Sequence, residues 1–101
     1  MFELEIKDQE LLLVSPKGDL DINTVKSFQD QVLEAYRPLN KDLTFDLANL
    51  DYIDSTGLGA IITVYKEVME KGKKLSVINP KKNIKKLFYI TELDSLFEIG
   101  D

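Results

Sequence analysis

Apolar and charged residues alternate along the first segment of the chain. Residues 2–6 place an apolar side chain at every second position, the period expected of a half-buried strand. Residues 11–14 are a continuous apolar run before Pro16 and Gly18, which is typical of a strand covered on both faces. The two segments together predict an N-terminal hairpin of antiparallel strands.

Helical spacing replaces this alternation after Asp21. One apolar stripe consists of Val25, Phe28, Val32 and Tyr36. This helix is expected to end near Pro38, and Asp21 or Asn23 is its candidate cap. A second amphipathic helix is predicted after Ser55, with Gly72 just past its end.

Further strands are predicted at residues 43–47, 75–78 and 96–99, with another helix that opens at Pro80. Residues 48–51 are turn-rich and are expected to lead toward the second helix. The resulting order is ββαβαβαβ. Strands that alternate with amphipathic helices predict the α/β class, with a mixed, mostly parallel sheet and an antiparallel N-terminal edge strand.

Length and composition predict a single domain over residues 1–101, with 44% hydrophobic and 31% charged residues. The chain has no cysteine and no histidine, which removes thiolate chemistry and the commonest general base and metal ligand. The remaining polar residues show no recognisable catalytic spacing. We therefore expect a protein that is not an enzyme, with no catalytic residues, no metal site and no cofactor.

The N-terminal residues lack the basic region and apolar run of a signal peptide, and no stretch approaches the roughly 20 apolar residues of a membrane span. These features predict a cytoplasmic protein without a membrane partner. The formal net charge of −5 would repel a nucleic-acid backbone. Nucleic acid is therefore not an expected partner.

Two acidic loops are the candidate site. One covers residues 18–21 and the other residues 51–59, each at the carboxyl end of a predicted parallel strand, where binding sites of such folds gather. If the sheet is parallel here, the loops are neighbours. They would then bring together Asp19, Asp21, Asp54, Ser55 and Thr56.

Ser55 has two compatible interpretations. Its hydroxyl can cap the helix while Asp54 favours the positive end of the helix dipole. Alternatively, a phosphate on Ser55 would face unpaired N–H groups of the first turn. Gly57 and Gly59 cost about 1 kcal/mol each relative to alanine inside a helix, and close approach of a partner's active site is one reason to keep them.

Two other features leave alternatives open. An acidic cluster could hold Mg²⁺ in a phospho-aspartate receiver domain, but the last predicted strand lacks the lysine that this interpretation requires. A basic face on the predicted third helix consists of Lys81, Lys82, Lys85 and Lys86. It is expected to be solvated, with contact to an acidic protein surface as the alternative.

Residues 18–21 (Gly-Asp-Leu-Asp) and 52–59 (Tyr-Ile-Asp-Ser-Thr-Gly-Leu-Gly) resemble the signature of anti-sigma factor antagonists, in the STAS domain family. The resemblance extends over residues 2–99 and includes the late helix at residues 83–88. It implies a STAS-like fold and partner switching. In this scheme the unphosphorylated protein binds an anti-sigma factor that is also a serine kinase, and the sigma factor is released.

The resemblance also implies roles for individual residues. Ser55 matches the phosphoacceptor, Asp54 the acidic residue before it and Asp21 the acidic residue beside it. A metal-dependent serine phosphatase would reverse the modification, and the sigma factor would be affected only indirectly. The expected partner-binding residues are Asp19, Asp21, Asn23, Ile53, Asp54, Thr56, Gly57 and Leu58. A STAS domain that binds a small ligand is a further alternative.

Overall fold

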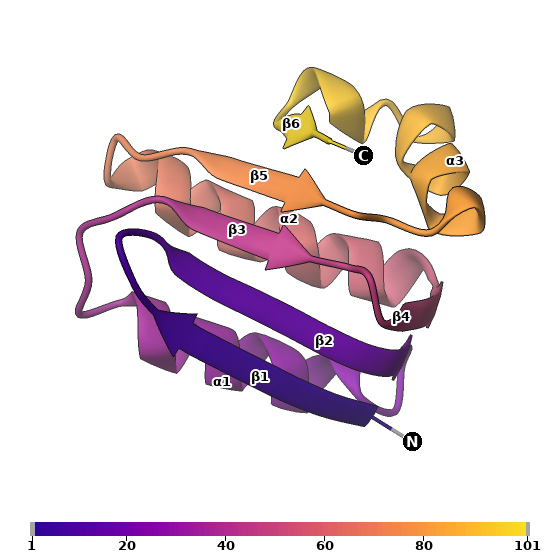
Figure 1. The fold of residues 1–101 in the computed structure, drawn as a ribbon, viewed down its shortest axis with the longest axis horizontal. Coiled ribbons are helices and arrows are strands. Elements are labelled where there is room, and N and C mark those ends of the chain that lie inside the picture. Colours follow the sequence, from indigo (N-terminus) through magenta and orange to yellow (C-terminus); the bar gives the residue numbers. More distant parts are fainter. Residues whose placement is uncertain (1, 101) are drawn as a thin grey trace.

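Helices α1 (Val25–Tyr36) and α2 (Ser55–Glu70) pack against each other on one face of a mixed sheet (Figure 1). The computed structural model describes residues 2–100. The strands are β1 (Phe2–Asp8), β2 (Leu12–Leu20), β3 (Leu43–Asp46), β4 (Leu50–Ile53), β5 (Leu75–Ile78) and β6 (Glu98–Ile99). The third helix, α3 (Lys82–Ile90), and the 3₁₀ helix η1 (Leu93–Ser95) lie beyond β5.

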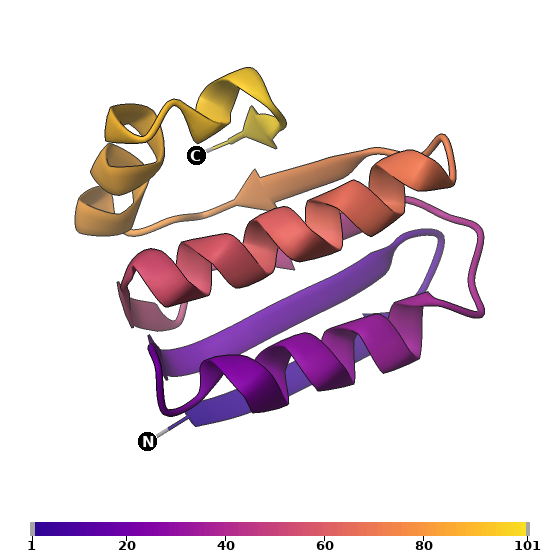
Figure 2. The same ribbon diagram turned by 180° about the vertical axis from the view of Figure 1, so that it is seen from behind.

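The strand order is β1-β2-β3-β5-β6, and β4 pairs with the end of β2. β1 and β2 are antiparallel, with Phe2 opposite Gly18 and Asp8 opposite Leu12, whereas the other pairs are parallel. This arrangement confirms the predicted class, a mostly parallel sheet with an antiparallel N-terminal edge strand. Because the helices run back against the parallel strands, the first turn of α2 lies where β2 and β4 end (Figure 2).

β2 is longer than the sequence predicts, since it continues through Pro16 and Gly18 to Leu20. Its parallel partner changes along its length, from β3 at Leu12–Val14 to β4 at the end of the strand. Pro16 lies between these two paired regions, so its missing N–H costs no hydrogen bond to a parallel neighbour. The register shifts after Gly18, which has a φ of 99° that favours glycine.

The expected turn at residues 48–51 is wrong in part, because β4 begins at Leu50. Its two outer residues are buried and its two central residues are exposed, so the segment lacks the alternation that identifies a strand. The observed order of strands and α-helices is ββαββαβαβ. Near the C-terminus, α3 begins at Lys82 and not at Pro80, and β6 is shorter than predicted.

Aromatic side chains fill the layer between helices and sheet. Phe28 of α1 and Phe45 of β3 are fully buried, with ring centroids 5.7 Å apart. A buried side chain of this size contributes about 1.5–3 kcal/mol relative to an exposed one. This packing fixes α1 on the sheet, and the buried residues Ile61, Val64 and Val68 fix α2, the helix that begins at Ser55. Within residues 2–100, none of the helices has the length and apolar character needed to span a bilayer.

Candidate functional site

Asp54 caps the N-terminus of α2. Its Oδ1 accepts hydrogen bonds from Thr56 N (3.0 Å), Thr56 Oγ1 (2.5 Å) and Gly57 N (3.1 Å). The hydroxyl of Thr56 is the main cause that lowers the pKa of Asp54, and the backbone N–H groups of Gly57, Thr56 and Ile22 add to it. The cap is therefore a carboxylate held in its charged form at a helix N-terminus.

Ser55 is the first residue of α2, and its side chain is exposed. The prediction that its hydroxyl caps the helix is wrong, because Asp54 takes that role. Within residues 2–100 the Ser55 side chain makes no hydrogen bond. The N–H groups of the first turn were expected to be unpaired, but those of Thr56 and Gly57 donate to the Asp54 carboxylate. A phosphate on Ser55 would therefore add charge beside a carboxylate without meeting those two donors.

The loop before α1 is organised by Asp21. Its carboxylate accepts a hydrogen bond from Asn23 N (2.9 Å), and its own N–H donates to Thr24 Oγ1 (3.0 Å). Thr24 occupies the N-cap position of α1 without a side-chain capping bond. The prediction that Asp21 or Asn23 caps this helix is therefore wrong, and Asp21 shapes the turn that precedes it.

The two acidic loops are neighbours, as predicted. Leu20 pairs with Ile53, and Asp54 N donates to Leu20 O at 3.2 Å. The N–H of Ile22 also lies close enough to the Asp54 carboxylate to lower its pKa. Asp54 therefore joins the loop after β2 to the start of α2.

The acidic side chains of the two loops are divided between two places. Asp19 pairs with Tyr52 in the sheet and lines a shallow hollow with Lys17 and Asp51, whereas Asp54 is engaged at the helix cap. Within residues 2–100 there is no cluster of three or more acidic side chains that could hold a metal ion.

Three residues that were expected to contact a partner lie below the surface. Ile53 and Leu58 are 5% and 7% exposed, and Gly57 is buried. A Cβ on Gly57 would lie 2.8 Å from Leu20 O and 2.7 Å from Ile53 Cγ1, so only glycine lets α2 approach β2 this closely. In the free chain these residues lie beneath the surface, and their contact with a partner stays a prediction. Gly59 is different, because it is exposed and nothing lies within 4 Å of its Cβ position.

Two large apolar side chains were missed as candidates. Ile22 is 68% exposed in the loop after β2, and Tyr52 is 50% exposed in β4. Ile22 lies next to the Asp54 cap, and Tyr52 is three residues before Ser55. Exposed apolar groups of this size are typical of protein interfaces. The available signal was their position, because Tyr52 lies within residues 51–59 and Ile22 directly follows residues 18–21.

The family model of the STAS domain matches residues 2–101. The chain belongs to the STAS domain family. It is 31% identical over 84 residues to an anti-sigma-B factor antagonist of Staphylococcus epidermidis, covering 83% of this chain and 78% of that protein. The corresponding protein of Staphylococcus aureus is 30% identical over the same shares.

Solved structures of other STAS proteins share the fold. An anti-sigma factor antagonist from Mycobacterium paratuberculosis has a TM-score of 0.82 at 19% identity, covering 99% of this STAS domain and 86% of that chain. The phosphorylated form of the Bacillus cell fate determinant SpoIIAA has a TM-score of 0.75 at 20% identity, covering 100% of this chain and 91% of that one. At these identities the likeness establishes the architecture described above.

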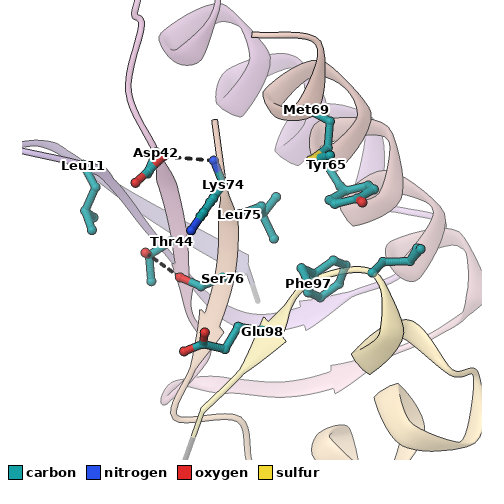
Figure 3. Close-up of a pocket in the computed structure, with 11 residues that line it drawn as sticks. Leu11, Asp42, Thr44, Tyr65, Met69, Lys74, Leu75, Ser76, Phe97 and Glu98 are labelled. Atoms are coloured by element: carbon teal, nitrogen blue, oxygen red, sulfur yellow. Dashed lines mark hydrogen bonds between the residues drawn. The ribbon is translucent and has the colours of Figure 1, made fainter. Parts of the chain in front are cut away.

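A separate cavity of about 390 Å³ lies near the beginning of β5 (Figure 3). Tyr65 and Met69 of α2 line it on the helix side together with Phe97. Thr44 and Ser76 contribute hydroxyls that share a hydrogen bond of 2.9 Å. Its volume is within the range of small-molecule pockets, and none of its lining residues belongs to the Ser55 site.

Proposed function

We propose that this STAS domain is a cytoplasmic, non-catalytic anti-sigma factor antagonist that is switched at Ser55. The unphosphorylated chain binds an anti-sigma factor serine kinase, which then releases its sigma factor. The kinase transfers the γ-phosphoryl group of ATP to Ser55 Oγ, and the modified chain dissociates. A metal-dependent serine phosphatase hydrolyses the phosphoester and restores binding.

The state of Ser55 is the observation that carries this proposal. Ser55 is exposed at the start of α2, while the Asp54 carboxylate already accepts hydrogen bonds from the N–H groups of the next two residues. The side chain is thus available to a kinase without any loss of the helix cap. The named relatives in Staphylococcus, both anti-sigma-B factor antagonists, support the choice of partner class.

The same geometry explains why phosphorylation would weaken binding. The new phosphate carries a charge of about −1.5 to −2 at neutral pH. It would lie beside the Asp54 carboxylate, and uncompensated like charge at an interface costs several kcal/mol. Since 1.4 kcal/mol corresponds to a tenfold change in affinity, such a cost is sufficient to exchange partners.

The test uses the purified chain with the anti-sigma factor kinase of its own organism and Mg²⁺-ATP. Mass spectrometry is expected to locate one phosphate on Ser55, and calorimetry is expected to show at least a hundredfold loss of kinase affinity after modification. Ser55→Ala should accept no phosphate and stay bound. Thr56→Val is the matched control, because it removes the neighbouring hydroxyl and should still be phosphorylated. A phosphate on another residue, or equal affinity of both forms, would contradict the proposal.

A further inference from the structure

One exposed stripe of α3 combines positive charge with apolar area. Ile84 and Phe88 are the buried residues of this helix. The opposite side carries four exposed residues that we call the α3 stripe: Lys82, Lys86, Tyr89 and Ile90. Lys86 lies one helical turn after Lys82, and Tyr89 and Ile90 lie about one turn after Lys86. Tyr89 is 47% exposed and Ile90 is 66% exposed.

The start of α3 is fixed to the segment that leads to Ser55. Lys81 Nζ forms an ion pair with the Asp51 carboxylate, and Asn83 Nδ2 donates to Asp51 O at 3.4 Å. Asp51 belongs to β4, which runs directly into the cap residue Asp54. Figure 1 shows α3 at the same end of the sheet as β4 and the first turn of α2. The stripe is thus held in a fixed position relative to the Ser55 site.

The charge of the stripe contrasts with the rest of the protein. The chain has a net charge of −5, so adjacent exposed lysines form a local positive patch on an acidic molecule. Such a patch attracts an acidic surface and accelerates association, because charge complementarity acts mainly on the encounter of two proteins. Tyr89 and Ile90 then offer apolar area that is buried only once the partner has docked.

We propose that the α3 stripe is a second contact surface for the kinase that modifies Ser55, and that the kinase surface which meets it is acidic. This inference rests on the proposed function and adds the chemistry of the partner. The charges give the α3 stripe and Ser55 different roles in kinase binding. The α3 stripe attracts the kinase in both states of the switch, and the phosphate on Ser55 determines whether the complex persists.

The test reverses the charge of the stripe with Lys82→Glu/Lys86→Glu. Lys82 is the first residue of α3, where the helix dipole favours glutamate. Lys86 lies in the middle of the helix, where glutamate and lysine have similar helix propensity, so α3 is expected to form. The matched control, Lys66→Glu/Lys74→Glu, changes the net charge equally through exposed lysines of α2 and of the segment before β5, which lie outside the α3 stripe and the Ser55 site. Stopped-flow association with the kinase is measured at low and high salt.

The α3 variant is expected to associate at least tenfold more slowly than the control at low salt, and the difference should shrink at high salt because charges are screened. Tyr89→Ser/Ile90→Ser should instead raise the dissociation rate about tenfold. At saturating kinase, Ser55 should still be the phosphorylated residue in each variant.

Three results would overturn the inference. Equal association rates for the α3 variant and its control would leave the stripe without a role in kinase binding. Binding of the wild-type chain to phosphatidylcholine–phosphatidylglycerol vesicles that is lost in the α3 variant, with kinase association unchanged, would assign the stripe to a membrane surface. If the wild-type chain does not bind the kinase at all, the proposed function fails together with this inference. Equal association rates with intact kinase binding would contradict only the role of the α3 stripe.

Discussion

The two ends of the sheet present different kinds of surface. Where β2 and β4 end, the exposed side chains of Ser55 in α2 and Ile22 in the loop after β2 lie beside the Asp54 cap, whose carboxylate is bonded to the N–H groups of the helix start. Near the beginning of β5, side chains surround a cavity of about 390 Å³. A projecting side chain suits covalent modification and contact with a protein, whereas a cavity suits a small molecule. The fold therefore separates the candidate switch from the candidate ligand pocket.

The two ends of α2 also differ in what they contact. At the Ser55 end, α2 is capped by Asp54, the residue directly before it. At the other end, Lys71 Nζ donates to two carbonyl oxygens just after α1: Arg37 O at 2.6 Å, and Leu39 O. The contact at the Asp54 end is local in the sequence, whereas the contact of Lys71 joins α2 to the end of α1. Substitutions can therefore perturb each end separately.

Gly57→Ala is expected to have the largest effect, and it acts at the Ser55 end. A methyl group there would lie 2.8 Å from Leu20 O, so α2 or β2 must move. We expect the free energy of unfolding to fall by about 3 kcal/mol, the upper end of overpacking costs. Kinase affinity should also fall, because Ser55 moves with the helix. Urea denaturation followed by circular dichroism measures the stability.

Gly59→Ala is the matched control for that substitution. Gly59 lies in the same helix, and no heavy atom lies within 4 Å of its Cβ position. Alanine should therefore raise the free energy of unfolding by about 1 kcal/mol, while it weakens kinase binding if the partner approaches the helix here. Equal losses of stability in both variants would show that the contact with Leu20 is not what requires Gly57.

Lys71→Met is expected to have a smaller effect, confined to the other end. It removes the donor to the carbonyl groups of α1 and the contact of the ammonium with the Tyr36 ring, whose centroid is 4.7 Å away. We expect the melting temperature to fall in line with a loss of about 1 kcal/mol. Phosphorylation of Ser55 should stay within twofold of the wild-type rate. Lys66→Met, an exposed lysine of the same helix, is the control.

The contrast between local and long-range contacts also separates what the sequence could predict from what it could not. The N-terminal hairpin, predicted from residues 2–6 and 11–14, and the helix after Ser55 are both present, although β2 continues to Leu20. β4 was missed because its burial does not alternate. The contact of Lys71 with Arg37 joins residues 34 positions apart, and no spacing rule indicates it.

The site was predicted in the same uneven way. Ser55 at an exposed helix start follows from the local order of residues, and the parallel sheet places the loop of Asp21 beside it. The burial of Ile53 could not be predicted, since the sequence indicates no strand at residues 50–53 and the residue is covered only when α2 packs close to β4 and β2. Leu58 falls on the apolar stripe of the helix after Ser55, so periodicity did indicate that it is buried. Periodicity identifies elements, and packing decides which of their residues reach the surface.

The smallest expected effect is the pH dependence of the Asp54 cap. Its pKa in the folded chain is lowered, chiefly by the Thr56 hydroxyl, so the charged form binds protons less readily than in the unfolded chain. A carboxylate of this kind stabilises the fold above its unfolded pKa of about 3.9, and the contribution is lost as the pH falls through the lowered value. Asp54→Asn keeps the capping ability but has no charge to titrate. We therefore expect the wild type to be more stable than this variant at pH 7, and the difference in stability to narrow from about pH 5 downward.

Thermal unfolding between pH 7 and pH 2 measures this difference in stability, with Asp94→Asn at an exposed position of η1 as the control. A gap that widens toward low pH would show that the charge of Asp54 does not support the helix that carries Ser55.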